Sequence, residues 1–182
     1  MKTLNEIYDN YQFPDGHGDK GTAHTYINEY SKLLEDYRGG SSVLEIGVHT
    51  GLSLKMWSEY FTDSQIYGID ISDRNFMKGL KEDGGFTIFI GDATQPNILD
   101  CFPTNLKFDV IIDDGSHKLK HQVNSFNIFK KRMNPNGLYI IEDIESIDTS
   151  IDTFNSMHSN FEIIDNRKIK NRSDDVLVIY RF

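Results

Sequence analysis

The sequence predicts an α/β fold built on one doubly wound sheet of seven strands, with helices on both faces. Apolar, β-branched runs alternate five times with segments of helical spacing, as in parallel sheets joined by crossover helices. The last two apolar runs flank a polar loop, which predicts a terminal hairpin. No repeat or linker divides the 182 residues. A single domain is therefore expected over 1–182, with a helical cover over 1–39 and the sheet core over 40–182.

Two helices are expected before the first strand. Thr3 and Glu6 have the spacing of a capping box, which predicts a short first helix. The second helix is expected to begin at a Thr22 cap and to end before Gly39, with tyrosines and leucines recurring on one face. A loop rich in glycine and charge separates them over 14–21. These helices are expected to cover the sheet or the mouth of a cofactor site.

The core elements then follow in alternation, each strand marked by an apolar run and each helix by apolar residues three or four positions apart. The expected strands are 42–48, 65–71, 86–90, a run from 108 that breaks at Gly115, 137–143, 161–165 and 176–180. The expected helical segments are 52–61, 74–82, 96–101, 118–133 and 149–158. Residues 134–137 are expected to form a turn, and 166–175 a polar, basic hairpin loop.

Composition restricts the class of function. The net charge of -9 disfavours non-specific binding to nucleic acid or to anionic membranes. No apolar run approaches the roughly 18 residues of a membrane-spanning helix, and the first residues lack the apolar core of a signal peptide. A single cysteine excludes an internal disulfide framework and fits a reducing compartment. We therefore expect a cytoplasmic protein with no nucleic-acid or membrane partner.

Glycines and acids at the ends of the first three strands predict a nucleoside site. Gly47 and Gly51 lie in the turn after the first strand, where glycine lets the backbone approach a ligand closely. Asp70 ends the second strand, where an acid accepts hydrogen bonds from ribose hydroxyls. Asp92 ends the third and is placed to reach an adenine amino group. The turn lacks the pattern G-x-G-x-x-G, which favours a nucleoside without phosphates. The alternative is a plain tight turn with solvated acids.

The fourth and fifth strands both end in titratable side chains. Asp113, Asp114 and His117 follow the fourth strand, and Glu142 and Asp143 end the fifth. Open α/β sheets present reactive groups at the carboxyl ends of their strands. If the two strands are parallel neighbours, these five side chains meet at one edge. Alternation puts Asp113 on the opposite side from Asp114, so Asp113 is expected to be structural or to touch the cofactor.

Four segments, VLEIGVHTG, IYGIDIS, GDAT and FDVIIDDG, together resemble the class I S-adenosylmethionine-dependent methyltransferases. The resemblance covers residues 40–182. It implies a Rossmann-like sheet with the strand order 3-2-1-4-5-7-6, an antiparallel seventh strand, and S-adenosylmethionine as cofactor. The core residues then expected to bind the cofactor are Glu45, Gly47, Gly51, Asp70, Asp92 and Asp113.

Within that superfamily, IDDGSH, IIED and GDKGTAHTY resemble the metal-dependent O-methyltransferases that act on sugar hydroxyls of macrolides and other glycosylated natural products. In that family, the acid of D-G-S-H and the E-D pair bind magnesium, and the histidine is the general base. Carried over to this sequence, the resemblance implies Asp114, Glu142 and Asp143 as metal ligands. It implies His117 as the catalytic base.

Two segments depart from the family pattern. The early segment usually reads G-T-D-K and lies over the cofactor, whereas this chain has Gly18 where threonine is common. Asp19 and Lys20 are kept, and the resemblance implies that both contact the cofactor. The turn before the fifth strand usually reads P-G-G, and here Asn136 replaces the first glycine, which is compatible because asparagine tolerates the left-handed conformation.

Methylation of a sugar hydroxyl requires activation, because the pKa of such a hydroxyl lies far above 7. A divalent cation lowers that pKa, and a positioned base removes the proton. Three carboxylates suit Mg²⁺ best, with Mn²⁺ or Ca²⁺ as alternatives, and the sequence has no cysteine cluster of the kind that binds zinc. The sequence therefore predicts a metal-dependent O-methyltransferase of a sugar, a glycosylated metabolite or a polysaccharide.

Other interpretations stay open at this point. A catechol-like phenol as acceptor would use the same metal and acids, and a non-catalytic nucleoside-binding module would keep the cofactor site. His117 alone is also compatible with a simple helix start. His24, His49 and His121 lie near the expected ligands, and the sequence does not decide whether they touch them. It leaves open the acceptor, the methylated position and a homo-oligomeric state.

Overall fold

The computed structural model describes residues 2–11, 18–73 and 85–182. Seven strands form one sheet in the order β3-β2-β1-β4-β5-β7-β6, and β7 runs antiparallel to both of its neighbours. The other pairs of neighbouring strands are parallel. The strands are β1 Ser42–Ile46, β2 Gln65–Asp70, β3 Phe86–Ile90, β4 Phe108–Asp113, β5 Met133–Ile141, β6 Phe161–Asp165 and β7 Val176–Arg181. The predicted fold class and strand order are confirmed.

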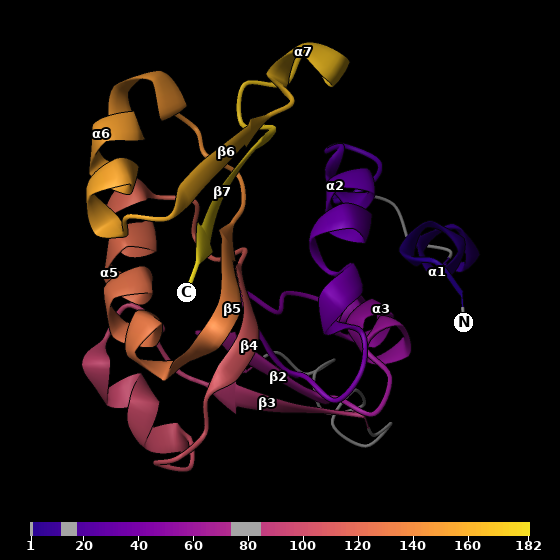
Figure 1. Cartoon of the computed structure of the whole chain (residues 1–182), viewed down its shortest axis with the longest axis vertical. Helices are drawn as coiled ribbons and strands as arrows, with labels where there is room; N and C mark the ends of the chain where they lie inside the picture. The colour runs from indigo at the N-terminus through magenta and orange to yellow at the C-terminus, as the bar shows by residue number, and fades with distance from the viewer. Residues whose placement is uncertain (1, 12–17, 74–84) are drawn as a thin grey trace.

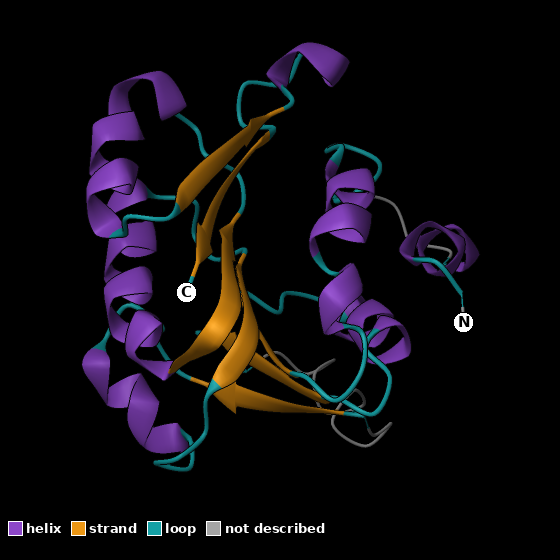
Figure 2. Cartoon of the chain, viewed as in Figure 1, coloured by secondary structure: helices purple, strands orange, loops and turns teal. Residues whose placement is uncertain are grey.

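Helices cover both faces of this sheet (Figures 1 and 2). On one face lie α1 Leu4–Asn10, α2 Tyr26–Leu33 and α3 Leu52–Tyr60. The opposite face carries α5 Leu119–Phe129 and α6 Ile147–Met157, and α7 Arg167–Lys170 connects β6 to β7. Three 3-10 helices span Glu35–Tyr37, Pro96–Cys101 and Lys130–Arg132. The expected helix over 74–82 lies outside the described residues. Within the described ranges, no helix is long and apolar enough to cross a membrane.

Two hydrophobic cores hold the layers together, one on each face of the sheet. Tyr30 and Trp57 are fully buried in the core under α2 and α3, and Phe126 is fully buried in the core under α5. Alternate residues of β4 enter different cores: Val110 packs on the first side and Ile111 on the second. A strand buried on both faces has a continuous run of apolar residues, which explains why β4 could be predicted from the sequence.

The start of α2 differs from the prediction. The helix begins at Tyr26, and Thr22 does not cap it, because its hydroxyl donates a hydrogen bond to the Gly18 carbonyl instead. Thr25 precedes the helix, and both its amide and its hydroxyl donate to the carboxylate of Asp175, at 3.1 and 3.0 Å. A contact with a residue near the other end of the sequence therefore sets the start of α2, which no local capping pattern reveals.

The loop predicted over 166–175 contains the short helix α7, and this helix contacts the N-terminal segment. The Lys170 ammonium donates hydrogen bonds to the carbonyls of Gly21, Thr22 and His24, at 2.9, 2.6 and 2.8 Å. Part of this basic segment thus binds backbone carbonyls rather than water. It fixes the turn that follows Lys20 in the sequence.

The strand β5 also begins earlier than predicted, at Met133 rather than at residue 137. Its pairing with β4 is irregular between Phe108 and Val110, and Asn136 adopts a left-handed φ of 64°. The left-handed residue expected in a turn is therefore present, but it lies within the irregular first part of β5. The carboxyl end of β5, which carries the predicted site residues, is regular and pairs with the end of β4 at Asp113.

Candidate active site

A cavity of about 670 Å³ opens at the carboxyl ends of the parallel strands. It brings together most of the predicted site residues from five separate segments of the chain. Those lining it are Asp19, Lys20, Gly47, Asp70, Asp92, Asp113, Asp114 and His117, and they are joined by His49 and His121. Glu45, Gly51, Glu142 and Asp143 are not among the residues that line this cavity.

Gly47 holds the turn at the cofactor end of the cavity. Its φ is +92°, and a Cβ atom there would lie 2.0 Å from the carbonyl oxygen of Asp114. Both the left-handed conformation and the close approach require glycine. The amide of Gly47 donates to the carbonyl of Ile69 on β2, at 2.8 Å. The turn therefore brings the ends of β1, β2 and β4 into contact.

Asp70 organises the same turn through its carboxylate. One oxygen accepts hydrogen bonds from the amides of Val48 and His49, at 3.1 and 2.9 Å, and the other accepts from the amide of Ser72, at 2.9 Å. Three of the roughly four acceptor sites of the carboxylate are thus filled, and the oxygen that Ser72 contacts has capacity for one further donor. Asp70 can therefore keep its loop contacts while it accepts a hydrogen bond from a ligand in the cavity.

Asp92 is held in a similar way by the turn that follows β3. Its carboxylate accepts hydrogen bonds from the amide and the hydroxyl of Thr94, at 2.9 and 2.7 Å, and these bonds lower the pKa of Asp92. Asp92 is thus an ionised acceptor at the cavity wall.

Two further polar side chains of the cavity, Ser116 and His121, contact each other, with 2.6 Å between Oγ and Nδ1.

Asp113 is almost completely buried, with 3% of its surface exposed. Its carboxylate accepts hydrogen bonds from Ser125 on α5 and from the hydroxyl of Tyr139 on β5. Burial raises its pKa to about 6, although these hydrogen bonds oppose the shift. Asp113 thus ties α5 to the sheet and also borders the cavity, in agreement with the structural role expected from strand alternation.

Glu45 lies beneath α3 and has no exposed surface. Its carboxylate accepts hydrogen bonds from the Ser53 hydroxyl and the Trp57 indole, at 2.6 and 3.1 Å, and burial raises its pKa to about 7. Gly51, with a φ of 73°, is the residue before α3. Both residues therefore support the helix that follows the glycine turn, and a direct contact with the cofactor stays a prediction.

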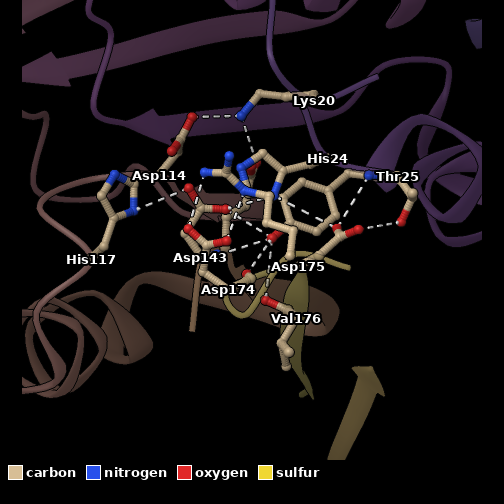
Figure 3. Close-up of polar contacts among 12 residues, drawn as sticks. Lys20, His24, Thr25, Asp114, His117, Asp143, Asp174, Asp175 and Val176 are labelled. Carbon is tan, nitrogen blue, oxygen red and sulfur yellow. Dashed lines mark hydrogen bonds and ion pairs between the residues drawn. The ribbon is translucent and has the colours of Figure 1, made fainter. Parts of the chain in front are cut away.

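At the other end of the cavity, the Lys20 ammonium lies between predicted metal ligands (Figure 3). It contacts Asp114 Oδ2 and Glu142 Oε1, both at 2.6 Å, and lies 3.8 Å from Glu45. Only 5% of the Lys20 side chain is exposed. Burial lowers the pKa of Lys20, but the carboxylates outweigh this effect and hold it well above its usual value. Lys20 is therefore a buried counter-cation to these acids, and its expected contact with the cofactor stays a prediction.

Two tyrosines and a histidine from the N-terminal segment also contact Glu142 and Asp143. Tyr30 donates to the same oxygen of Glu142 at 2.5 Å, and Tyr26 donates to Asp143 Oδ1 at 2.8 Å. The His24 ring, 1% exposed, lies 3.4 Å from that Asp143 oxygen. Burial raises the pKa of both Glu142 and Asp143. The predicted metal ligands therefore meet at one place, under a cover of tyrosines and a lysine.

His117 faces this group from the start of α5. Its Nδ1 lies 3.5 Å from Asp143 Oδ2, and about a third of its side chain is exposed. His117 and Asp143 both adopt left-handed φ angles, 57° and 54°, which non-glycine residues rarely do. Strained backbone persists where the surrounding structure enforces it, and it concentrates at active sites. The backbone thus holds the two side chains toward each other.

The residues at this end fit a divalent cation. Asp114, His117 and Asp143 each offer one ligand atom, and these atoms lie within 4.8 Å of one another. The His117 Nδ1 atom is buried without a hydrogen-bond partner. Glu142 lies outside this group because its oxygen faces Lys20 and Tyr30. Oxygen ligands from carboxylates favour Mg²⁺, Mn²⁺ or Ca²⁺.

A second group, His24, Asp143 and Asp174, has similar spacing but is already neutralised. The Arg172 guanidinium lies 2.7 and 3.0 Å from the two oxygens of Asp174. Asp114 and His117 line the cavity, whereas His24, Asp143 and Asp174 are not among its lining residues, so the group around Asp114 is the better placed to meet a substrate.

Sequence reasoning left the contacts of His24 open and took Tyr26 and Tyr30 as packing residues of the second helix, so it missed the roles of all three. A local signal existed, since Tyr26 and Tyr30 are four positions apart and lie on one helical face. The periodicity indicates that the two rings share a face, but it does not say that their hydroxyls reach acids.

A family model described as a methyltransferase domain matches residues 44–144. The chain is 35% identical over 150 residues to demethylmacrocin O-methyltransferase of Streptomyces fradiae, which covers 78% of this chain and 36% of that protein. It is 37% identical over 133 residues to mycinamicin VI 2''-O-methyltransferase of Micromonospora griseorubida, covering 68% and 32%. The chain thus spans about a third of the length of these curated relatives.

Among solved structures, the chain resembles MycE methyltransferase from the mycinamycin biosynthetic pathway, solved in complex with Mg and SAH. The TM-score is 0.69 at 26% identity, and the match covers 99% of this chain and 55% of that one. The fold is also that of the N-methyltransferase NodS of Bradyrhizobium japonicum, with a TM-score of 0.65 at 15% identity over 92% of this chain and 98% of that one. Because the family model spans more than half of its residues, from β1 to the turn after β5, this chain belongs to the methyltransferase domain family.

Proposed function

We propose that this chain is an S-adenosylmethionine-dependent and divalent-metal-dependent O-methyltransferase. Its proposed acceptor is a hydroxyl on a sugar, a glycosylated metabolite or a polysaccharide. One observation carries the proposal: a single cavity joins Asp70 and Asp92 at one end to Asp114 and His117 at the other. A nucleoside-linked methyl donor and a hydroxyl acceptor can thus meet inside it. The relatives are named as O-methyltransferases, which supports a hydroxyl as the acceptor.

At the cofactor end, the proposed ligand is the adenosyl part of the donor. Asp70 accepts a hydrogen bond from a ribose hydroxyl with the acceptor site that its loop amides leave available. Asp92, ionised and fixed by Thr94, accepts from the adenine amino group. The turn at Gly47 has no side chain, so the donor can lie directly on the backbone.

At the acid end, Asp114, Glu142 and Asp143 are the residues proposed to hold the ion. A bound divalent cation supplies Lewis-acid chemistry, which lowers the pKa of a hydroxyl in its coordination sphere. The carboxylates of Asp114 and Asp143 lie close enough to share one cation. The Glu142 side chain contacts Lys20 and Tyr30 and joins the set only when it exchanges these partners.

His117 is proposed to take the proton of the acceptor hydroxyl. Its Nδ1 faces Asp143, which leaves Nε2 as the nitrogen for proton transfer. The negative charge of Asp143 stabilises the imidazolium that forms, as an acid does for the histidine of a catalytic dyad. The methyl donor is already activated. The main tasks left to the protein are therefore to position the acceptor hydroxyl and to remove its proton.

The broader expectations are kept as part of this proposal. We propose one domain, in which residues 1–39 cover a core over 40–182, in the cytoplasm and without nucleic-acid or membrane partners, as the net charge of -9 supports. Acceptor selection is assigned to the N-terminal helices, the loop after Asp143 or a second copy in a homo-oligomer. The second helix borders the acid end of the site, where Tyr26 contacts Asp143 and Tyr30 contacts Glu142.

The test is a methyl-transfer assay with isotopically labelled S-adenosylmethionine. The acceptor panel contains deoxysugar glycosides, free sugars and catechols, each with Mg²⁺ and with a chelator. We expect label in the sugar glycosides, and only with the metal. Label confined to catechols would reassign the acceptor to a phenol. Tight cofactor binding with no turnover and no metal effect would favour a non-catalytic nucleoside-binding module.

A further inference from the structure

The positive charge of Lys20 can serve two groups of carboxylates, one at the acid end of the cavity and one on the proposed cofactor. Among the described residues that line the cavity, it is the one lysine or arginine. S-adenosylmethionine carries a carboxylate on its amino-acid part, and a carboxylate in a buried site needs a cation. Yet the Lys20 ammonium already lies 2.6 Å from both Asp114 and Glu142. One cation therefore faces two sets of anionic partners.

A divalent ion at the acid end would compete directly with this ammonium. Mg²⁺ binds carboxylate oxygens at about 2.1 Å. Lys20 occupies Asp114 Oδ2 and Glu142 Oε1, which belong to two of the three proposed metal ligands. Two cations held on the same buried oxygens repel strongly, because the surrounding protein screens charge poorly. Binding of the ion should therefore displace the ammonium.

The backbone of Lys20 cannot follow its side chain. Its carbonyl accepts hydrogen bonds from the amides of Tyr26 and Ile27, at 2.8 and 3.3 Å. The next residues are fixed by Lys170, which binds the carbonyls of Gly21, Thr22 and His24. With the main chain held at the start of α2, the displaced ammonium swings on its four-carbon stem into the cavity that Lys20 already lines.

We propose that Lys20 couples the metal site to the cofactor site. The divalent ion replaces the Lys20 ammonium at Asp114 and Glu142, and the released ammonium binds the carboxylate of S-adenosylmethionine. This inference rests on the proposed function and adds a residue that links its two halves. Since coupling between binding sites is reciprocal, cofactor binding also tightens metal binding by the same factor.

The first experiment measures this coupling in the unmodified chain by calorimetry. S-adenosylhomocysteine carries the carboxylate, and 5'-methylthioadenosine lacks the amino-acid part. We expect saturating Mg²⁺ to tighten S-adenosylhomocysteine binding by about 10-fold, a usual size for such coupling. The affinity for 5'-methylthioadenosine should stay the same. Equal effects on both ligands, or no effect on S-adenosylhomocysteine, would overturn the proposal.

The second experiment replaces the cation. Lys20→Met should bind Mn²⁺ at least 10-fold more tightly by electron paramagnetic resonance, since no ammonium competes, and Mg²⁺ should no longer tighten S-adenosylhomocysteine. Lys168→Met is the matched control, because it removes the same charge at an exposed position of α7. Unchanged or weaker Mn²⁺ binding in Lys20→Met would contradict displacement.

A third measurement needs no variant and therefore does not depend on the folding of Lys20→Met. Reductive methylation followed by mass spectrometry reports how accessible each lysine is. The buried Lys20 should be protected without metal, become reactive with Mg²⁺, and be protected again when S-adenosylhomocysteine is added. A Lys20 that stays protected with Mg²⁺ alone has not been displaced, and the proposal fails.

Failure of this inference differs from failure of the proposed function. Asp114→Asn should lose Mn²⁺ binding if the metal site is correctly assigned. If it does, and Lys20→Met binds Mn²⁺ like the unmodified chain, only the coupling is wrong. If neither the unmodified chain nor Lys20→Met binds Mn²⁺, the metal site and the coupling fall together.

Discussion

The two ends of the cavity obtain their hydrogen bonds from different parts of the chain. At the cofactor end, Asp70 is bound by amides of the neighbouring glycine turn and of its own loop, and Asp92 by Thr94 two residues away. At the acid end, the partners come from the N-terminal segment. Lys20 is 94 positions from Asp114 and 122 from Glu142 in the sequence.

This difference indicates how each end can bind a ligand. The acids of the cofactor end keep free lone pairs while they organise their own loops, so that end is formed in advance and needs little rearrangement. The acid end is closed by Lys20, Tyr26 and Tyr30, which contact its carboxylates. Under the proposed displacement, an ion enters by replacing such a partner. The predictions below test this contrast, from the largest expected effect to the smallest.

The largest effect is expected for His117→Ala. Turnover should fall by on the order of 10²–10⁴, the usual contribution of a general base. Affinities for S-adenosylhomocysteine and Mn²⁺ should remain within a few fold, because the other residues at both ends are intact. Steady-state kinetics on the glycoside that the chain methylates, together with calorimetry, would measure both. Normal turnover at saturating Mg²⁺ would remove His117 from the catalytic role.

Asp114→Asn should act on the acid end alone. Loss of a charged ligand should weaken Mn²⁺ binding by on the order of 100-fold. Binding of 5'-methylthioadenosine, which lacks the amino-acid part and cannot reach Lys20 through a carboxylate, should not change, because Asp70 and Asp92 are untouched. Asp148→Asn serves as the control, since Asp148 is exposed on α6 and paired with Arg167. Equal losses in the two variants would mean that the Asp114 carboxylate does not bind the ion.

Asp70→Ala is the reciprocal test at the cofactor end. It removes charge-assisted hydrogen bonds to the ribose and to the amides of Val48 and His49. Binding of S-adenosylhomocysteine should weaken by about 30-fold, or about 2 kcal/mol. Mn²⁺ affinity without cofactor should stay the same. If calorimetry instead finds normal cofactor affinity, Asp70 serves only its own loop.

The smallest effect concerns stability and uses two matched tyrosines. Tyr30→Phe removes the donor to Glu142, and Tyr139→Phe removes the donor to Asp113. Each should lower the free energy of unfolding in urea by about 1–2 kcal/mol, since a buried carboxylate loses a hydrogen bond. Only Tyr30→Phe should also change Mn²⁺ affinity. A change in Mn²⁺ affinity with Tyr139→Phe would contradict the claim that metal binding depends on the partners of the acid end alone.

Much of the fold could be predicted from the sequence, because the patterns that indicate its strands lie within a few neighbouring residues. A strand such as β4 is buried on both faces, so its apolar run stands out, and the acids that end β2, β4 and β5 follow directly in the chain. Parallel strands place their carboxyl ends at one edge, which is enough to predict that Asp70, Asp92 and Asp114 share a cavity. Gly47 was marked by its turn, and the structure supplies the reason in the nearby Asp114 carbonyl.

The choice of partners at the acid end was decided only by the tertiary structure. Lys20 was expected at the cofactor, and nothing in its local sequence indicates that its ammonium lies between Asp114 and Glu142. The start of α2 likewise depends on Asp175, 150 positions after Thr25. Helix periodicity and strand alternation act over a few residues, whereas an ion pair depends on distance in space and on burial. The chain must fold before Lys20 can meet these acids, and so its place could be read only from the folded protein.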